Sequence, residues 1–256
     1  MEIINNNVSE SQEKSKKTAL IIGGGGGIGS EITRSMVKKG IKVYATYHDT
    51  SPEPKLEDIK GSLLNLCKMN LIDSESVKDS IKKILRDNKI DIVVFSATLP
   101  IENKPIMKME WQDIEKHIDI QVKGLFNVFE CLKEQIANKY KTKFIIILTE
   151  YVVGKPPASL SHYITSKYSL FGFAKCMAVE LAKYNCTINM ISPGMVKTDL
   201  ISNLPHKLIE LTEQNNPLKR IAIPKDISNL VLFLSSDESD YLNGANIIIN
   251  GGGIML

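Results

Sequence analysis

The chain has 256 residues, 43% of them hydrophobic and 24% charged, and a formal net charge of +3. These values are ordinary for a globular protein, and the small, scattered charge argues against nucleic-acid binding. No apolar run approaches the roughly 18–20 residues that span a membrane. The four cysteines lack metal-ligand spacing and the start does not resemble a signal peptide. We therefore expect free thiols, no metal site and a cytoplasmic protein.

Short apolar runs alternate with helical patterns along most of the chain. Residues 1–16, rich in Asn, Ser, Glu and Lys, are expected to form a disordered tail. Strands are predicted at 18–23, 41–47, 64–69, 91–96, 143–149, 186–191 and 245–249, and helices at 27–39, 74–87, 111–138, 160–184 and 225–236. This alternation predicts an α/β fold over 17–256, a single doubly wound domain. Its parallel seven-stranded sheet would carry helices on both faces.

The most informative segment is a glycine run between the first predicted strand and the first predicted helix. Glycine accepts positive φ angles and close approach of a ligand, and a helix N-terminus attracts phosphate. We therefore predict a pyrophosphate cradle that opens a βαβ nucleotide-binding unit, although a flexible turn would also fit. Both Gly24-x-Gly26-x-x-Gly29 and Gly23-x-x-x-Gly27-x-Gly29 are present. The candidate contacts are Gly23, Gly25, Gly26, Gly27, Ile28 and Gly29.

Tyr163 and Lys167 stand at i and i+4 at the start of a predicted helix. Such a pair shares one helical face, and a nearby cation lowers a phenol pKa, which suits acid/base catalysis. Tyr151 and Lys155 repeat the spacing, but Gly154 and two prolines mark that stretch as a loop. The pair at 163 and 167 is therefore preferred. His162 is expected to face solvent.

Open α/β sheets bind ligands at the carboxyl ends of their strands. The segments that follow the predicted strands are thus further candidates, and the long strand-free stretch at about 198–222 is expected to be a lid. Candidate nucleotide contacts in these segments are Tyr47, His48, Asn70, Leu71, Ser96, Ala97 and Thr98.

Taken together, the motifs resemble the short-chain dehydrogenase/reductase family from about residue 17 to the C-terminus. The matching segments occur in family order: the glycine motif, Asp91-Ile92-Val93-Val94, Tyr163-x-x-x-Lys167, Asn189 to Gly194 with Thr198, Pro217 to Arg220 with Pro224-Lys225-Asp226, and Ser236 to Gly252. The resemblance implies a Rossmann fold, hydride transfer with nicotinamide, and proton transfer by Tyr163. Lys167 would hold the ribose and lower the Tyr163 pKa. Pro193, Gly194, Val196 and Thr198 would face the carboxamide.

Three positions depart from the family pattern. The family's relay Asn is replaced by Gln121, and the Asn-Asn-Ala-Gly after the fourth strand by Phe95-Ser96-Ala97-Thr98. The usual catalytic Ser position holds Glu150. Glu150 cannot donate a hydrogen bond when ionised, so we assign the hydroxyl role to Thr149 and the relay position to Gln121.

The resemblance favours an NAD(P)-dependent oxidoreductase that acts on a small or carrier-protein-linked carbonyl, such as a 3-oxoacyl thioester. The alternative is a nucleotide-binding scaffold with lost or altered redox chemistry. An epimerase or dehydratase would need a larger substrate domain. NADP(H) is favoured over NAD(H), because Tyr47 replaces the Asp that reads a ribose 2′-hydroxyl, although no basic residue stands at Gly26. The resemblance also implies a homotetramer or homodimer, formed through 111–138, 160–184 and the C-terminal strand. The apolar end Ile254-Met255-Leu256 is easier to explain if a partner subunit covers it.

Overall fold

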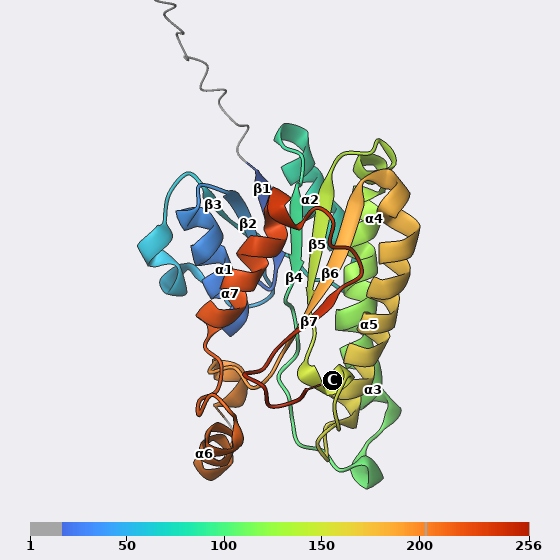
Figure 1. The fold of residues 1–256 in the computed structure, drawn as a ribbon. Coiled ribbons are helices and arrows are strands. Elements are labelled where there is room, and N and C mark those ends of the chain that lie inside the picture. The colour runs from blue at the N-terminus through green and yellow to red at the C-terminus, as the bar shows by residue number, and fades with distance from the viewer. Residues whose placement is uncertain (1–16, 203, 256) are drawn as a thin grey trace, which may run out of the picture.

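The computed structural model describes residues 17–202 and 204–255, so the tail expected at 1–16 lies outside the described residues. Seven parallel strands form one sheet in the order β3-β2-β1-β4-β5-β6-β7 (Figure 1). The strands are β1 (Thr18–Ile22), β2 (Lys42–Tyr47), β3 (Leu64–Lys68), β4 (Ile92–Phe95), β5 (Thr142–Ile147), β6 (Cys186–Pro193) and β7 (Asn246–Ile249). The doubly wound parallel sheet predicted from the sequence is confirmed.

Helices cover both faces of the sheet. They are α1 (Gly27–Lys38), α2 (Ser74–Asp87), α3 (Trp111–Ile118), α4 (Gly124–Ala137), α5 (Ser161–Leu181), α6 (His206–Asn215) and α7 (Pro224–Ser235). Helices α1 and α7 pack on one face, where Ile32 and Val231 meet Ile21 and Val94. The other face carries α2, α4 and α5.

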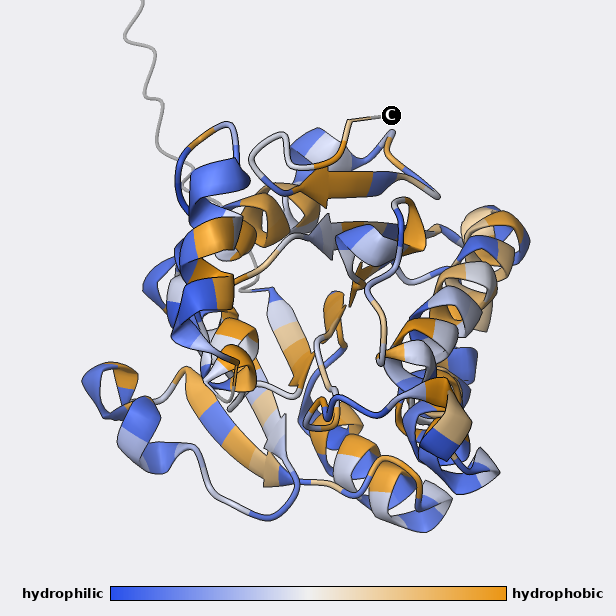
Figure 2. Ribbon diagram, turned by 90° about the horizontal axis from the view of Figure 1, so that it is seen from below, coloured by the Kyte–Doolittle hydropathy of each residue, from blue (hydrophilic) through white to orange (hydrophobic). Residues whose placement is uncertain are grey.

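The central strands β1 and β4 read as continuous apolar runs because both of their faces are buried. All five residues of β1 and all four of β4 are buried. Figure 2 shows apolar residues concentrated on the strands and mixed with hydrophilic ones on the surrounding helices. One hydrophobic cluster packs on each face of the sheet. This packing holds the strands in place and so fixes where their ends lie.

The order of the strands places the site. The chain leaves β1 toward β2 and β3 on one side, whereas β4, next to β1, leads to β5, β6 and β7 on the other. Connections diverge between β1 and β4, and ligands of open α/β sheets bind at such a switch point, beyond the carboxyl ends of the strands.

The helix expected at 111–138 is interrupted. The structure instead has α3, a π-helical turn over Asp119–Lys123, and α4. The N–H of Gly124 bonds the carbonyl of Asp119 there, one residue further than in an α-helix. Such π-bulges are frequently found at functional sites, and the apolar periodicity of the sequence does not reveal them.

The stretch expected to be a lid also has internal structure. It contains a short 3-10 turn, Asp199–Ile201, and helix α6. A parallel bridge between Val196 and Ala222 closes its base. The segment therefore leaves and re-enters the fold at neighbouring points.

Candidate active site

A cavity of about 890 Å³ lies at the switch point. The predicted contacts that line it are Gly23, Gly25, Gly26, Gly27, Ile28, Gly29, Tyr47, His48, Asn70, Leu71, Ser96, Ala97, Thr98, Tyr163, Lys167 and Thr198. Thr149 and Gln121 are not among the lining residues, but each bonds one of them: Thr149 bonds Tyr163 and Gln121 bonds Lys167. Pro193 and Val196 are buried and do not line the cavity. Gly194 lines a different cavity.

The glycine turn is shaped to receive a phosphate. Gly23 has φ +78°, and a Cβ there would lie 2.9 Å from the backbone of Ala97, so a side chain would not fit. Helix α1 begins with Gly26 as N-cap and no side chain caps its first turn. By contrast, the Asp73 side chain accepts from two N–H groups at the start of α2. The free N–H groups of α1 open on the cavity and fit the pyrophosphate of a dinucleotide.

Lys167 is buried beneath the cavity, 3% exposed. Its Nζ donates to the Ile147 carbonyl at 2.8 Å and to Gln121 Oε1 at 3.2 Å. Burial lowers the pKa of Lys167 to about 7. This amine is therefore much less charged at neutral pH than a surface lysine.

Gln121 connects Lys167 to the end of β4. Its side chain is fully buried in the π-helical turn, and its Nε2 donates to the Ala97 carbonyl at 3.0 Å. The amide thus accepts from the lysine and donates to the strand end at the same time. The glutamine side chain, one methylene longer than an asparagine, reaches from Lys167 to the Ala97 carbonyl directly.

Tyr163 lies on the same helix as Lys167, with Nζ 5.8 Å from the centre of its ring. The Thr149 side chain hydrogen-bonds the phenol, which lowers the Tyr163 pKa, but the larger effect of burial raises it to about 12. This differs from the lowered pKa that the resemblance implied. The physical reason is the burial of the phenol, which the lysine does not offset because its amine points at Ile147 and Gln121.

Thr149 and Glu150 point into different parts of the molecule. Thr149 has an extended backbone two residues beyond β5, and Glu150 begins a short 3-10 turn, Glu150–Val152, so the direction of the chain changes between them. Thr149 contacts Tyr163, whereas Glu150 Oε2 accepts from Asn250 Nδ2 at 2.9 Å. Burial raises the pKa of the Glu150 carboxyl, and the bond from Asn250 partly offsets this.

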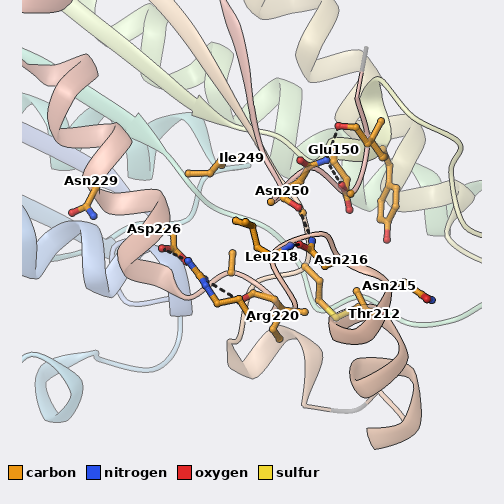
Figure 3. A pocket seen from close by; sticks show the side chains of 18 residues that line it. Glu150, Thr212, Asn215, Asn216, Leu218, Arg220, Asp226, Asn229, Ile249 and Asn250 are labelled. Atoms are coloured by element: carbon orange, nitrogen blue, oxygen red, sulfur yellow. Dashed lines mark hydrogen bonds and ion pairs between the residues drawn. The ribbon is translucent and has the colours of Figure 1, made fainter.

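Glu150 therefore belongs to a second cavity, of about 560 Å³ (Figure 3). Several of the polar side chains that line this cavity have partners within it. Asn216 Nδ2 donates to the Asn250 carbonyl at 2.7 Å, and Arg220 pairs with Asp226 at 2.6 Å. Gly194 lies here, against Asn250.

Sequence reasoning missed two features near the site. His162 does not face solvent as expected: it is 3% exposed on α5, and its ring meets that of buried His117 edge-to-face at 4.8 Å. Lys55 lines the cavity, yet no motif marked it. The unusual length of the connection at 48–63 is the signal that could have drawn attention to that segment.

Comparison with known proteins identifies the family. Residues 23–253 match the family model described as enoyl-(acyl carrier protein) reductase. The 3-oxoacyl-[acyl-carrier-protein] reductase FabG of Rickettsia conorii is 33% identical over 236 residues, 90% of this chain and 93% of that protein. FabG of Staphylococcus epidermidis is 30% identical over 231 residues, 88% of this chain and 94% of that protein.

Solved structures show the same fold. A 3-ketoacyl-(acyl-carrier-protein) reductase from Brucella melitensis, complexed with NADH, aligns with a TM-score of 0.85 at 22% identity, covering 93% of this chain and 98% of that one. A putative gluconate dehydrogenase from Agrobacterium tumefaciens also gives 0.85, at 23% identity, with 94% and 96% coverage. The sequence match over almost the whole chain establishes that this protein belongs to the short-chain dehydrogenase/reductase family of NAD(P)-dependent oxidoreductases.

Proposed function

We propose that this protein reduces a 3-oxoacyl thioester carried on an acyl carrier protein, with NADP(H) as its cofactor. The observation that carries the proposal is the placement of the Tyr163 phenol, bonded by Thr149, in the same cavity as the glycine turn. The names of the relatives support the substrate class. Leu99, Pro100, Ile101 and Leu200 give this cavity an apolar wall that suits an acyl chain.

The roles follow from the protonation states. When bound, the nicotinamide supplies or accepts the hydride. Because burial raises the pKa of Tyr163 to about 12, its phenol stays protonated at neutral pH and can donate to the oxygen of a carbonyl that is being reduced. Thr149 bonds this phenol and provides a second hydroxyl for the same oxygen.

Lys167 would return the proton to Tyr163, with Gln121 as the hydrogen-bond partner that orients its amine. Lys167 exchanges protons readily near neutral pH because burial lowers its pKa to about 7. Gln121 accepts from this amine and donates to the Ala97 carbonyl, and neither group has a proton to pass on. Gln121 would therefore hold the amine in place, and the proton that Lys167 returns would come from solvent. Gln121, which bonds Lys167 directly, stands at the position where the family has its relay asparagine.

A nucleotide-binding scaffold without redox turnover is the second candidate. The observation that favours it is Glu150, which stands at the usual position of the catalytic serine and turns into the other cavity. Such a scaffold would differ from a reductase in binding the cofactor without turning over any carbonyl compound. Thr149 beside Tyr163 favours the reductase.

The segment at 198–222 would act as a lid on the cavity, which Thr198, Asp199, Leu200 and Ser202 line.

Within the part of the chain that the structure describes, no helix is long and apolar enough to cross a membrane. The free thiols of Cys67, Cys131, Cys176 and Cys186 are compatible with a reducing compartment such as the cytoplasm, which cell fractionation would test.

The first prediction concerns Tyr163. With NADPH and a 3-oxoacyl thioester, the wild-type chain should turn over, and Tyr163→Phe should lose on the order of 10²–10⁴-fold in kcat because only the proton donor is removed. Cofactor Kd, measured by calorimetry, should stay within a factor of about two. Near-normal turnover of the variant would refute the role. A wild type that binds NADPH and reduces no carbonyl would favour the scaffold.

The second prediction separates Thr149 from Glu150. Thr149→Val should lower kcat on the order of 10²-fold, since a donor to the developing oxyanion is lost. Thr149→Ser keeps the hydroxyl and should recover most of the rate. Glu150→Gln keeps the shape and should change kcat by less than about threefold. The reverse ranking of the Thr149 and Glu150 variants would assign the role to Glu150.

The third prediction concerns pH. The pKa of Lys167 is about 7 in the folded chain and about 10.4 when unfolded. Between these values the unfolded state binds a proton that the folded state does not, so stability rises with pH. Without cofactor, wild type should gain on the order of 2 kcal/mol over Lys167→Met between pH 7 and 9. An unchanged difference in unfolding free energy between the two proteins would contradict this.

The fourth prediction concerns assembly, which we propose to involve α4 and α5. Apolar side chains are exposed on both, with Phe126 39% and Val179 80% accessible. Sedimentation at micromolar concentration should show a dimer or tetramer, and Val179→Glu should shift it toward smaller species. The matched change Lys183→Glu lies beyond the end of α5 and should have little effect. A wild-type monomer of 28.5 kDa would rule the assembly out.

A further inference from the structure

Lys55 brings a positive charge to the end of the cavity where the second strand finishes. It lines the cavity together with Tyr47, His48 and Thr50. The end of β2 is where the fold reads the ribose of a dinucleotide. This lysine comes from the connection between β2 and β3 and not from the glycine motif.

The segment that carries Lys55 is fixed against the glycine turn and α1. A Cβ on Gly25 would lie 2.6 Å from Pro52 Cβ, so the absence of a side chain at Gly25 lets Pro52 sit on the turn. Arg34 of α1 donates to the Lys55 carbonyl at 2.8 Å and forms a bidentate pair with Asp58. Leu56 is 1% exposed. The backbone around Lys55 is therefore held in place beside the glycine turn.

The Lys55 ammonium is paired with a group that can be replaced. Its Nζ lies 2.6 Å from Asp199 Oδ2, at the start of the proposed lid, with the side chains 53% and 81% exposed. An exposed pair of this kind contributes little free energy. A phosphate, with more charge and more acceptor oxygens than a carboxylate, would compete for the ammonium.

The other charges of the cavity leave this role to Lys55. Its other lysines are Lys167, which bonds Gln121 at the Tyr163 end, and Lys116 of α3, which lies 3.6 Å from Asp113. The carboxylates that line the cavity are Asp119 and Asp199. Asp49, which follows His48 in sequence, pairs with that imidazole at 3.0 Å and is not among the lining residues.

We infer that Lys55 binds the ribose 2′-phosphate of NADP(H), exchanging its partner Asp199 for the phosphate. This assignment rests on the proposed NADP(H) preference. The glycine motif has no basic residue at Gly26 to bind this phosphate. Lys55 would supply the positive charge instead, from a segment that packs against Gly25. Because Asp199 begins the lid, phosphate binding also releases the contact between the lid and the β2–β3 connection.

Calorimetric Kd values for NADPH and NADH test the inference on the full chain. Lys55→Met should weaken NADPH about tenfold, since one charge-assisted contact is lost, and leave NADH within about twofold. Lys60→Met is the matched control: it removes an exposed lysine of the same segment that pairs with Glu53 and does not line the cavity. It should leave both Kd values unchanged.

Asp199→Asn should act in the opposite direction, because it removes the competitor for Lys55. NADPH should bind more tightly to this variant and NADH equally well. An NADPH Kd that Lys55→Met leaves unchanged, or weakens no more than Lys60→Met does, overturns the inference. Tighter binding of NADH than NADPH by wild type would overturn the proposed cofactor instead. In that case the NADPH Kd of Lys55→Met still decides the Lys55 assignment: weaker binding supports it and unchanged binding overturns it.

Discussion

Burial of the Lys167 amine at the end of β5 is the constraint on which the site depends. A buried polar or charged group is costly unless it is hydrogen-bonded, so the amine must find partners inside the protein. It finds the Ile147 carbonyl and Gln121, and Gln121 reaches the Ala97 carbonyl. These bonds hold α5, the π-helical turn and the ends of β4 and β5 in one arrangement. Tyr163, one turn earlier on α5, is positioned by the same contacts.

The sheet supplies the complementary half of the site. Because β1 and β4 are neighbours and their connections diverge, the glycine turn after β1 faces the segment after β4. The closeness of Gly23 to the backbone of Ala97 shows how tightly these two strand ends approach. The cavity is thus bounded by a glycine turn that fits phosphate and by the helix that carries the phenol. Such an arrangement suits transfer of a hydride next to a proton donor.

Two consecutive residues after β5, Thr149 and Glu150, direct their side chains into different parts of the molecule. Thr149 bonds the phenol, and its neighbour Glu150 turns to Asn250 in the other cavity. A carboxylate in contact with a developing oxyanion would repel it, so this difference in direction removes the conflict that Glu150 presents in the sequence. Asn250, which donates to Glu150, also accepts at its carbonyl from Asn216, so the Glu150 carboxylate is held by a bonded pair of asparagines away from Tyr163.

The sequence by itself determined the parallel sheet, the glycine turn and the spacing of Tyr163 and Lys167, because apolar runs, glycines and an i,i+4 pair act over a few residues. It did not determine the π-helical turn around Gln121, since one extra residue in a helix barely alters apolar periodicity. Nor could it show the direction of the Lys167 amine, which depends on the carbonyls that burial leaves within reach. Lys55 is the clearest case. Only the packing of Pro52 on Gly25 and the bonds from Arg34 bring it to the cavity, and such long-range contacts are decided by the tertiary structure.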